Sequence, residues 1–224
     1  GIKTVAGATT NFGDVIVETG GLLTVSQAVI TTPTSSIGGG RVTLEATTGG
    51  ITTSGSGTIT TSGNTTGAGG EIYLHNIATG DITIGANITA KGGATSGNGA
   101  TVTVLNQAGF IAVNAIIDVS KVGTGNDGSI LLKASGDITE SGAGGVVGNT
   151  NGYLLGYSTG GKVLLDTKAN NKMATAAFRT DTAAGTNGTV TYKDFDALTI
   201  DTVAATGTLT SPSTGLAAST VGPL

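Results

Sequence analysis

The sequence predicts an all-β protein, a right-handed parallel β-helix (β-solenoid) of about seven coils with three short strands in each coil. The first observation behind this prediction is a composition rich in Thr, Val, Ile and Gly, with 40 glycines among 224 residues, because β-branched residues favour strands. The second is a charged fraction of only 11% with a mean hydropathy of +0.23, which argues against a disordered chain. The third is an internal repeat.

Runs of the form apolar-x-apolar mark the first strand of each coil. Successive runs begin about 27–33 residues apart, a period that is typical of solenoid coils. The seven runs start at Val15, Val42, Ile72, Val102, Ile130, Val163 and Val190. One coil cannot bury its own apolar face, so this repeat predicts a stack in which neighbouring coils bury it.

Two further series of short apolar runs supply the second and third strands of the coils. The second series consists of 23–25, 51, 82–84, 111–113, 138 and 198–200, and the third of 59, 88, 117–119 and 209. Glycines separate the runs, as in "GDITIGANITAKGG" at 80–93, and glycine allows the positive φ that a sharp corner needs. Strands about 4.8 Å apart make a rod about 34 Å long, and parallel crossovers are almost always right-handed.

Alternation of side chains along a strand assigns the two faces of the first series. Positions one and three of each run point inward, whereas positions two and four face solvent. The outward second positions include Tyr73, Leu131 and Leu164, of which the last two would be neighbours on successive coils. A contiguous exposed apolar patch indicates a contact surface. Its partner is either the irregular segment 170–181, folded over the patch, or another molecule.

The outward fourth positions of the first series form a second row along the rod. His75 is expected to lie beside Glu45 in this row. Further along, Lys133, Asp166 and Lys193 would form a ladder of alternating charge. Exposed ion pairs contribute only about 0.2–1 kcal/mol each, so the ladder would favour the register more than the stability of the fold.

The chain is expected to form one domain, because no linker of distinct composition divides it. Residues 1–212 make up the β-solenoid, and residues 213–224 form a C-terminal tail or a connection to further repeats. The sequence does not begin with Met, and neither end offers an amphipathic helix to cover an open solenoid. We therefore expect either a piece of a much longer repeat protein or a subunit that stacks end to end.

The sequence contains few groups for catalysis, and no catalytic, cofactor-binding or metal-binding residue is predicted. Cys is absent and His75 is the only histidine, so thiolate metal sites are excluded and a solvated surface histidine is expected. Asp194, Asp196 and Asp201 are interpreted as solvated charge. The alternative is a polysaccharide-acting enzyme, which would need two carboxylates about 5–10 Å apart. A net charge of −4 gives no basic surface for nucleic acid, and no apolar run approaches the about 20 residues that span a bilayer.

Two other motifs are interpreted as structural. The segment "GTGNDGSI" at 123–130 is similar to a calcium-binding nonapeptide, but it does not recur nine residues later, so we interpret it as a turn. T-x-T pairs begin at Thr101 and Thr189, as in the threonine ranks of ice-binding solenoids. The matching positions of other coils hold other residues, which makes ice binding the least favoured function.

Gly-Asp-apolar turns at Gly13, Gly80 and Gly136, with glycine tracts at 92–99 and 123–128, carry a resemblance to a known family. The chain resembles the filamentous-haemagglutinin type of large bacterial exoprotein and adhesin. This resemblance implies a cell-surface or extracellular location. It also implies partners that are copies of the chain, neighbouring repeats, or cell-surface glycans and proteins. The expected function is a non-enzymatic structural or adhesive module of a large surface exoprotein or of a self-assembling filament.

Overall fold

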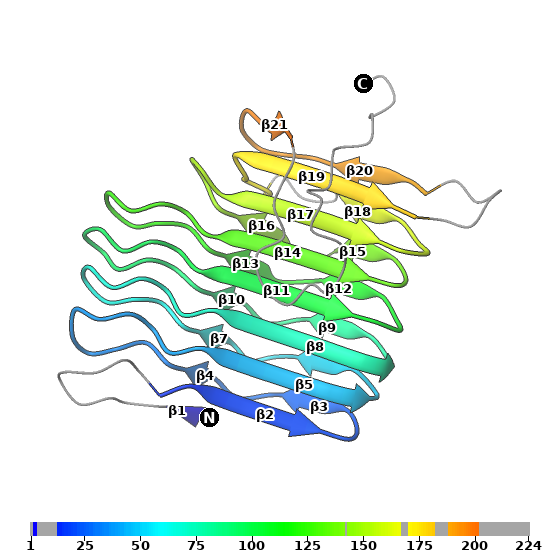
Figure 1. Cartoon of the computed structure of the whole chain (residues 1–224), viewed down its shortest axis with the longest axis horizontal. Helices are drawn as coiled ribbons and strands as arrows, with labels where there is room; N and C mark the ends of the chain where they lie inside the picture. The colour runs from blue at the N-terminus through cyan, green and yellow to red at the C-terminus, as the bar shows by residue number, and fades with distance from the viewer. Residues whose placement is uncertain (1, 4–12, 142, 167–169, 182–187, 202–224) are drawn as a thin grey trace.

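The computed structural model describes residues 2–3, 13–141, 143–166, 170–181 and 188–201. It confirms the predicted fold class, because these residues form three parallel sheets stacked as a β-solenoid (Figure 1). The described residues make about six turns and contain no helix.

The first sheet has eight strands, and each strand pairs in parallel with the equivalent strand of the next coil. Its strands are β2 (Val15–Thr19), β5 (Val42–Thr48), β8 (Ile72–Thr79), β11 (Thr101–Asn106), β14 (Ser129–Ala134), β17 (Tyr153–Ser158), β19 (Thr175–Thr180) and β21 (Thr199–Ile200).

The second and third sheets are built in the same way from shorter strands. The second sheet consists of β3 (Leu23–Val25), β6 (Ile51–Thr53), β9 (Ile82–Ile84), β12 (Ile111–Val113), β15 (Ile138–Glu140), β18 (Val163–Leu165) and β20 (Val190–Tyr192). The third sheet consists of β1 (Ile2–Lys3), β4 (Val29–Ile30), β7 (Ile59–Thr60), β10 (Ile88–Thr89), β13 (Ile116–Asp118) and β16 (Gly145–Val147).

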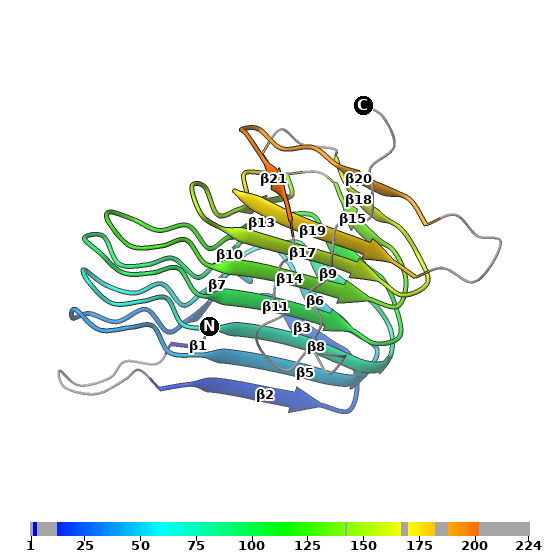
Figure 2. The same cartoon turned by 45° about the horizontal axis from the view of Figure 1, so that its top comes forward.

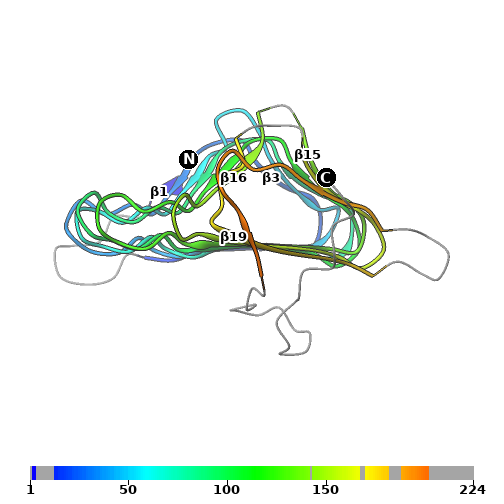
Figure 3. The same cartoon turned by 90° about the horizontal axis from the view of Figure 1, so that it is seen from above.

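Seen along the rod, each coil as far as β16 passes through the first, second and third sheets in turn and then returns to the first (Figure 3). After β16 the described strands alternate between the first and second sheets. The first sheet forms one flat side of the cross-section, and the other two sheets close the opposite side. In the first four coils the return is a long loop, and these loops stack into a flat extension that we call the wing (Figures 1 and 2). The wing consists of residues 31–41, 61–71, 90–100 and 119–128.

The core lies between the three sheets and is apolar in nearly every row. In the first sheet, Val42 and Leu44 point inward and are buried, and so are the equivalent pairs in β8, β11 and β14. The second sheet contributes fully buried isoleucines such as Ile82 and Ile111. Each fully buried side chain of this size stabilises the fold by about 1.5–3 kcal/mol. The predicted inward positions of these coils are therefore confirmed.

The corner between the first and second sheets shows why the sequence places glycine there. Gly80 has a φ of +100°, and a Cβ added to it would lie 2.5 Å from the backbone nitrogen of Gly50 in the neighbouring coil. Inside the same corner, Asn76 Nδ2 donates to Asn106 Oδ1 at 2.9 Å and to the Gly80 carbonyl at 2.9 Å. The asparagines thereby satisfy buried polar groups where the chain turns.

The wing packs backbone directly on backbone. A Cβ added to Gly97 would lie 2.7 Å from the carbonyl carbon of Gly67 in the preceding coil. Backbone hydrogen bonds join the loops, for example from Gly93 N to Gly67 O at 2.8 Å and from Gly69 N to Asn98 O at 2.9 Å. The glycines of the wing therefore serve close packing of backbone on backbone, whereas the sequence predicted only a role in sharp corners.

The predicted coil lengths are right for the first part of the chain and wrong for the rest. Val15 pairs with Val42 and Val102 with Ile130, as the predicted repeat requires. Ile130 then pairs with Leu154, well before the predicted run at Val163. The predicted runs at Val163 and Val190 belong to the second sheet. The coil between β14 and β17 is shorter because its return loop shrinks to residues 148–152. The next coils have no third-sheet strand among the described residues.

Candidate functional site

The predicted contact surface is not one continuous patch. Tyr73 and Leu131 lie on the outer face of the first sheet, separated by Thr103, which pairs with both. Leu164 lies in the second sheet, where it pairs with Thr139. The neighbour of Leu131 on the next coil is Leu155. The prediction failed because the shortened coil moved the Val163 run from the first sheet to the second.

Leu131 is also not exposed, in contrast to the prediction. Its side chain is 0% exposed and forms a second buried apolar cluster with Leu155 and Ala177, which lie in the same row of the first sheet. Ile16, at the other end of this row, is 59% exposed. The segment 170–181 is not a loop folded over this row, because it contains β19, the next strand of the same sheet.

The register of the predicted fourth row is confirmed as far as Lys133. Its predicted solvent exposure is not, because Leu105 in this row is 4% exposed and the His75 side chain is 12% exposed. His75 Nδ1 lies 2.9 Å from Glu45 Oε2, as expected, and His75 Nε2 lies 2.9 Å from Gln107 Nε2. The Tyr73 ring lies 5.5 Å from the His75 ring. Burial, and then the nearby charge of Glu45, raise the pKa of Tyr73. These contacts tie three successive coils together on the outer face.

Beyond Lys133 the row continues through Tyr157 and Arg179, so the predicted ladder with Asp166 and Lys193 is wrong. The Tyr157 ring lies between two cations, with Lys133 Nζ and Arg179 Cζ each 5.3 Å from its centroid. Tyr157 donates a 2.6 Å hydrogen bond to Asp181 Oδ2, and Arg179 Nε lies 2.7 Å from Asp181 Oδ1. The hydrogen bond from Arg179 holds the pKa of Asp181 below its ordinary value, and burial raises the pKa of Tyr157.

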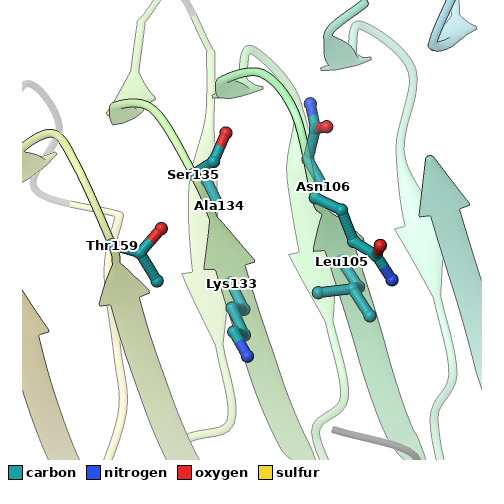
Figure 4. A pocket seen from close by; sticks show the side chains of 7 residues that line it. Leu105, Asn106, Lys133, Ala134, Ser135 and Thr159 are labelled. Atoms are coloured by element: carbon teal, nitrogen blue, oxygen red, sulfur yellow. The ribbon is translucent and has the colours of Figure 1, made fainter. Parts of the chain in front are cut away.

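A hollow of about 310 Å³ opens beside this row, where β11 and β14 end (Figure 4). It is lined by Leu105, Asn106, Gln107, Lys133, Ala134, Ser135 and Thr159. The lining has two amides, of which that of Asn106 is buried and donates to the Gly80 and Phe110 carbonyls. The Lys133 ammonium, the Gln107 amide and two hydroxyls can hold a small polar or anionic group there. None of these seven residues is an acid, so the lining itself offers no carboxylate pair for acid–base chemistry.

The acidic residues considered for catalysis have structural contacts. Asp194 accepts hydrogen bonds from the Tyr192 hydroxyl at 2.6 Å and from Met173 N at 3.0 Å. Burial is the largest cause that raises the pKa of Tyr192, followed by its bond to Asp194. Asp196 Oδ2 lies 3.0 Å from Lys172 Nζ. Asp201 follows β21 at the end of the described chain.

Asp127, the acid of the "GTGNDGSI" segment, caps backbone amides, which agrees with the interpretation of this segment as a turn. Its Oδ1 accepts from Lys121 N at 2.6 Å, and its Oδ2 accepts from Thr150 N at 2.8 Å and Asn151 N at 2.9 Å. Within the described ranges, no group of three or more His, Asp or Glu side chains could hold a metal ion. The same part of the chain has no helix that is long and apolar enough to cross a bilayer.

Three features of the structure, two on its surface and one buried, were not predicted from the sequence. The cation–aromatic row through Tyr157 and Arg179 was missed because β17 and β19 were not recognised as strands. The buried pair of Glu140 and Asn171, joined by a 2.7 Å hydrogen bond, carries no pattern that a sequence reveals. A threonine-rich row on the outer face of the second sheet was also missed. It runs through Thr24, Thr52, Thr83, Ala112, Thr139, Leu164 and Thr191.

Comparison with models of known protein families, with curated proteins and with solved structures finds no match to this chain.

Proposed function

We propose that this chain is a non-enzymatic structural and adhesive segment of an extracellular rod, like the bacterial surface exoproteins that its turns resemble. The observation that carries the proposal is the continuity of the apolar rows along the solenoid. Leu23 at one end and Val190 and Leu198 at the other are only partly buried, although they belong to or pack against the same core. Rows that stay apolar to both ends suit a stack that continues into further coils.

The strand edges support the same proposal. Among the described residues, β2 and β3 at one end and β20 and β21 at the other each pair with a single neighbouring strand. Such edges are templates for pairing with another chain or with another repeat.

The experiment that tests the proposal compares native material with the isolated chain. Electron microscopy and light scattering of the 21.6 kDa chain over a range of concentrations should show fibres if copies stack. Intact mass of the native protein should show a much longer polypeptide if neighbouring repeats supply the contacts. A 21.6 kDa native protein that stays monomeric at high concentration, without fibres, would contradict both arrangements.

The rival function, a polysaccharide-acting enzyme, predicts sugar release from acidic polysaccharides. We expect no release, because Asp194 and Asp196 already serve as hydrogen-bond and ion-pair partners within the corners of the last coils. Ice binding has one observation in its favour, the threonine-rich row of the second sheet. Ala112 and Leu164 interrupt this row, so we expect no inhibition of ice recrystallisation.

A further inference from the structure

The wing ends abruptly and leaves a step on the side of the rod. The four wing loops stack on one another, and the next return loop, residues 148–152, is much shorter. Figure 1 shows the long loops of the earlier coils giving way to short corners near β16 and β17. The outer surface of the solenoid therefore changes at this position, whereas it repeats from coil to coil along the wing.

A hollow of about 540 Å³ lies at this step. Three successive corners form its walls, each located just before a strand of the first sheet. The lining residues are Asn149, Thr150, Asn151, Tyr153, Lys172, Ala174, Thr175, Asp196, Ala197 and Thr199. This volume falls within the range of about 300–1,000 Å³ that is typical of small-molecule sites.

The wall formed by the first corner is held in place before any ligand arrives. The buried carboxylate of Asp127 accepts hydrogen bonds from the amides of Thr150 and Asn151. The side chain of Asn151 accepts from Asp127 N at 2.7 Å and donates to Asn126 Oδ1 at 2.8 Å. Asn149 has a positive φ of 36°, a left-handed conformation that Asn adopts more readily than most residues. A wall fixed in this way loses little conformational entropy on binding.

Aromatic side chains are exposed at this hollow. Tyr153, which lines the hollow, is 45% exposed, and Phe195, which precedes the lining residue Asp196 but does not itself line the hollow, is 66% exposed. Lys172 Nζ lies 5.9 Å from the Phe195 ring centroid and 3.0 Å from Asp196 Oδ2. Tyr153 is the one aromatic residue that lines the hollow, and its partly exposed ring offers a ligand an apolar surface.

The charge at the hollow is balanced, because its one lysine is paired with its one aspartate. The remaining polar lining consists of amides and hydroxyls, which can both donate and accept hydrogen bonds. An aromatic face beside such groups, without net charge, fits an uncharged ligand that has both an apolar face and several hydroxyls. We propose that this hollow binds a neutral pyranose sugar of a glycan, with one face of the sugar stacked on the Tyr153 ring. The inference deepens the adhesive part of the proposed function and rests on it.

The test is saturation-transfer NMR and calorimetric titration of the whole chain with methyl glycosides of glucose, galactose, mannose and N-acetylglucosamine. Glucuronate serves as the charged comparison. We expect at least one neutral sugar to bind more tightly than glucuronate. Tyr153→Ala should weaken that binding about tenfold, as expected for the loss of one stacked aromatic contact. Tyr153→Phe keeps the ring and should retain the affinity.

The control variant is Phe110→Ala, which removes a similarly exposed aromatic ring (44%) outside this hollow and should leave binding unchanged. Melting temperatures of all variants check that they fold. The inference is overturned if no neutral sugar gives a binding signal, or if glucuronate binds more tightly than every neutral sugar. It is also overturned if Tyr153→Ala binds the sugar as tightly as the native chain, or if Phe110→Ala loses as much affinity as Tyr153→Ala. If no sugar binds as expected but fibres or a long parent chain are found, the sugar-binding inference fails and the rod proposal stands. If a neutral sugar binds but neither fibres nor a long parent chain are found, only the rod proposal is contradicted.

Discussion

Gly97→Ala should destabilise the wing, although it adds only one methyl group at a site remote from the apolar core. The new Cβ would lie 2.7 Å from the carbonyl carbon of Gly67, and it would also approach the backbone nitrogen of Gly93. Both neighbours are backbone atoms, which cannot rotate away as a side chain can. The loop of the next coil packs just as closely on Gly97. A Cβ added to Gly125 in that loop would lie 2.6 Å from the carbonyl carbon of Gly97.

The expected loss of stability follows from this geometry. Overpacking a closely packed site costs about 1–3 kcal/mol, and rigid backbone on both sides places Gly97→Ala at the upper end of that range. For a chain of this size, each kcal/mol lowers the melting temperature by about 2–4 °C, so the expected drop is about 6–12 °C. The damage should begin at the hydrogen bond from Gly93 N to Gly67 O, which is 2.8 Å long.

Thermal denaturation and amide hydrogen exchange, with Gly21→Ala as the matched control, test this expectation. A Cβ added to Gly21 meets no atom within 4 Å, so the control should be neutral or slightly stabilising. Exchange at Gly93 should accelerate in Gly97→Ala and stay unchanged in the control. Equal melting temperatures and equal exchange for the two variants would refute the backbone packing of the wing.

Three other predictions concern the core, a buried phenol and a corner. Leu132→Asp, at a fully buried site, should lower the free energy of unfolding by several kcal/mol in chemical denaturation. Thr83→Asp, on the outer face of the second sheet, should be tolerated, and equal effects of the two variants would contradict the assigned faces. Burial raises the pKa of the Tyr192 phenol above its ordinary 10.0. The stability that the neutral phenol contributes should therefore be complete below pH 10 and fall above pH 10 by up to about 1.4 kcal/mol per pH unit. Urea titrations should show this loss in the native chain and not in Tyr192→Phe. Asp127→Ala should cost about 1.5–3 kcal/mol because its carboxylate accepts three backbone amides; a melting temperature equal to that of the exposed variant Asp166→Ala would contradict this role.

The sequence was sufficient to predict the fold class and the first five strands of the first sheet. Each of these strands carries two inward apolar residues, as Val42 and Leu44 do in β5, and each of the first four is followed by a coil with a wing loop of similar length. Periodicity is a reliable guide where both the strand and its connection repeat. The row from Glu18 to Lys133, including the contact between Glu45 and His75, was predictable for the same reason.

β17 was missed because one of its inward positions holds no apolar side chain. Gly156 occupies the position where β14 has Leu132, and the space is filled from the next coil by the ring of Phe178. A Cβ added to Gly156 would lie 2.8 Å from Phe178 Cδ1. The core at this level thus depends on a glycine and a phenylalanine that belong to successive coils and are paired in the register. A pattern sought within a single run cannot detect such compensation between coils.

The misplaced run at Val163 and the hollow at the step have the same physical origin. A regular solenoid presents nearly the same outer surface at every coil, so a ligand would find no preferred position along it. Shortening the return loop to 148–152 breaks this equivalence. It changes the residue spacing of the repeat, and it puts short corners on the surface at a level where the earlier coils have wing loops. Tyr153 and Lys172 line the hollow because the chain there turns back early. In a repeat protein, the place where periodicity fails is therefore also the place where the surface becomes distinctive enough for specific binding.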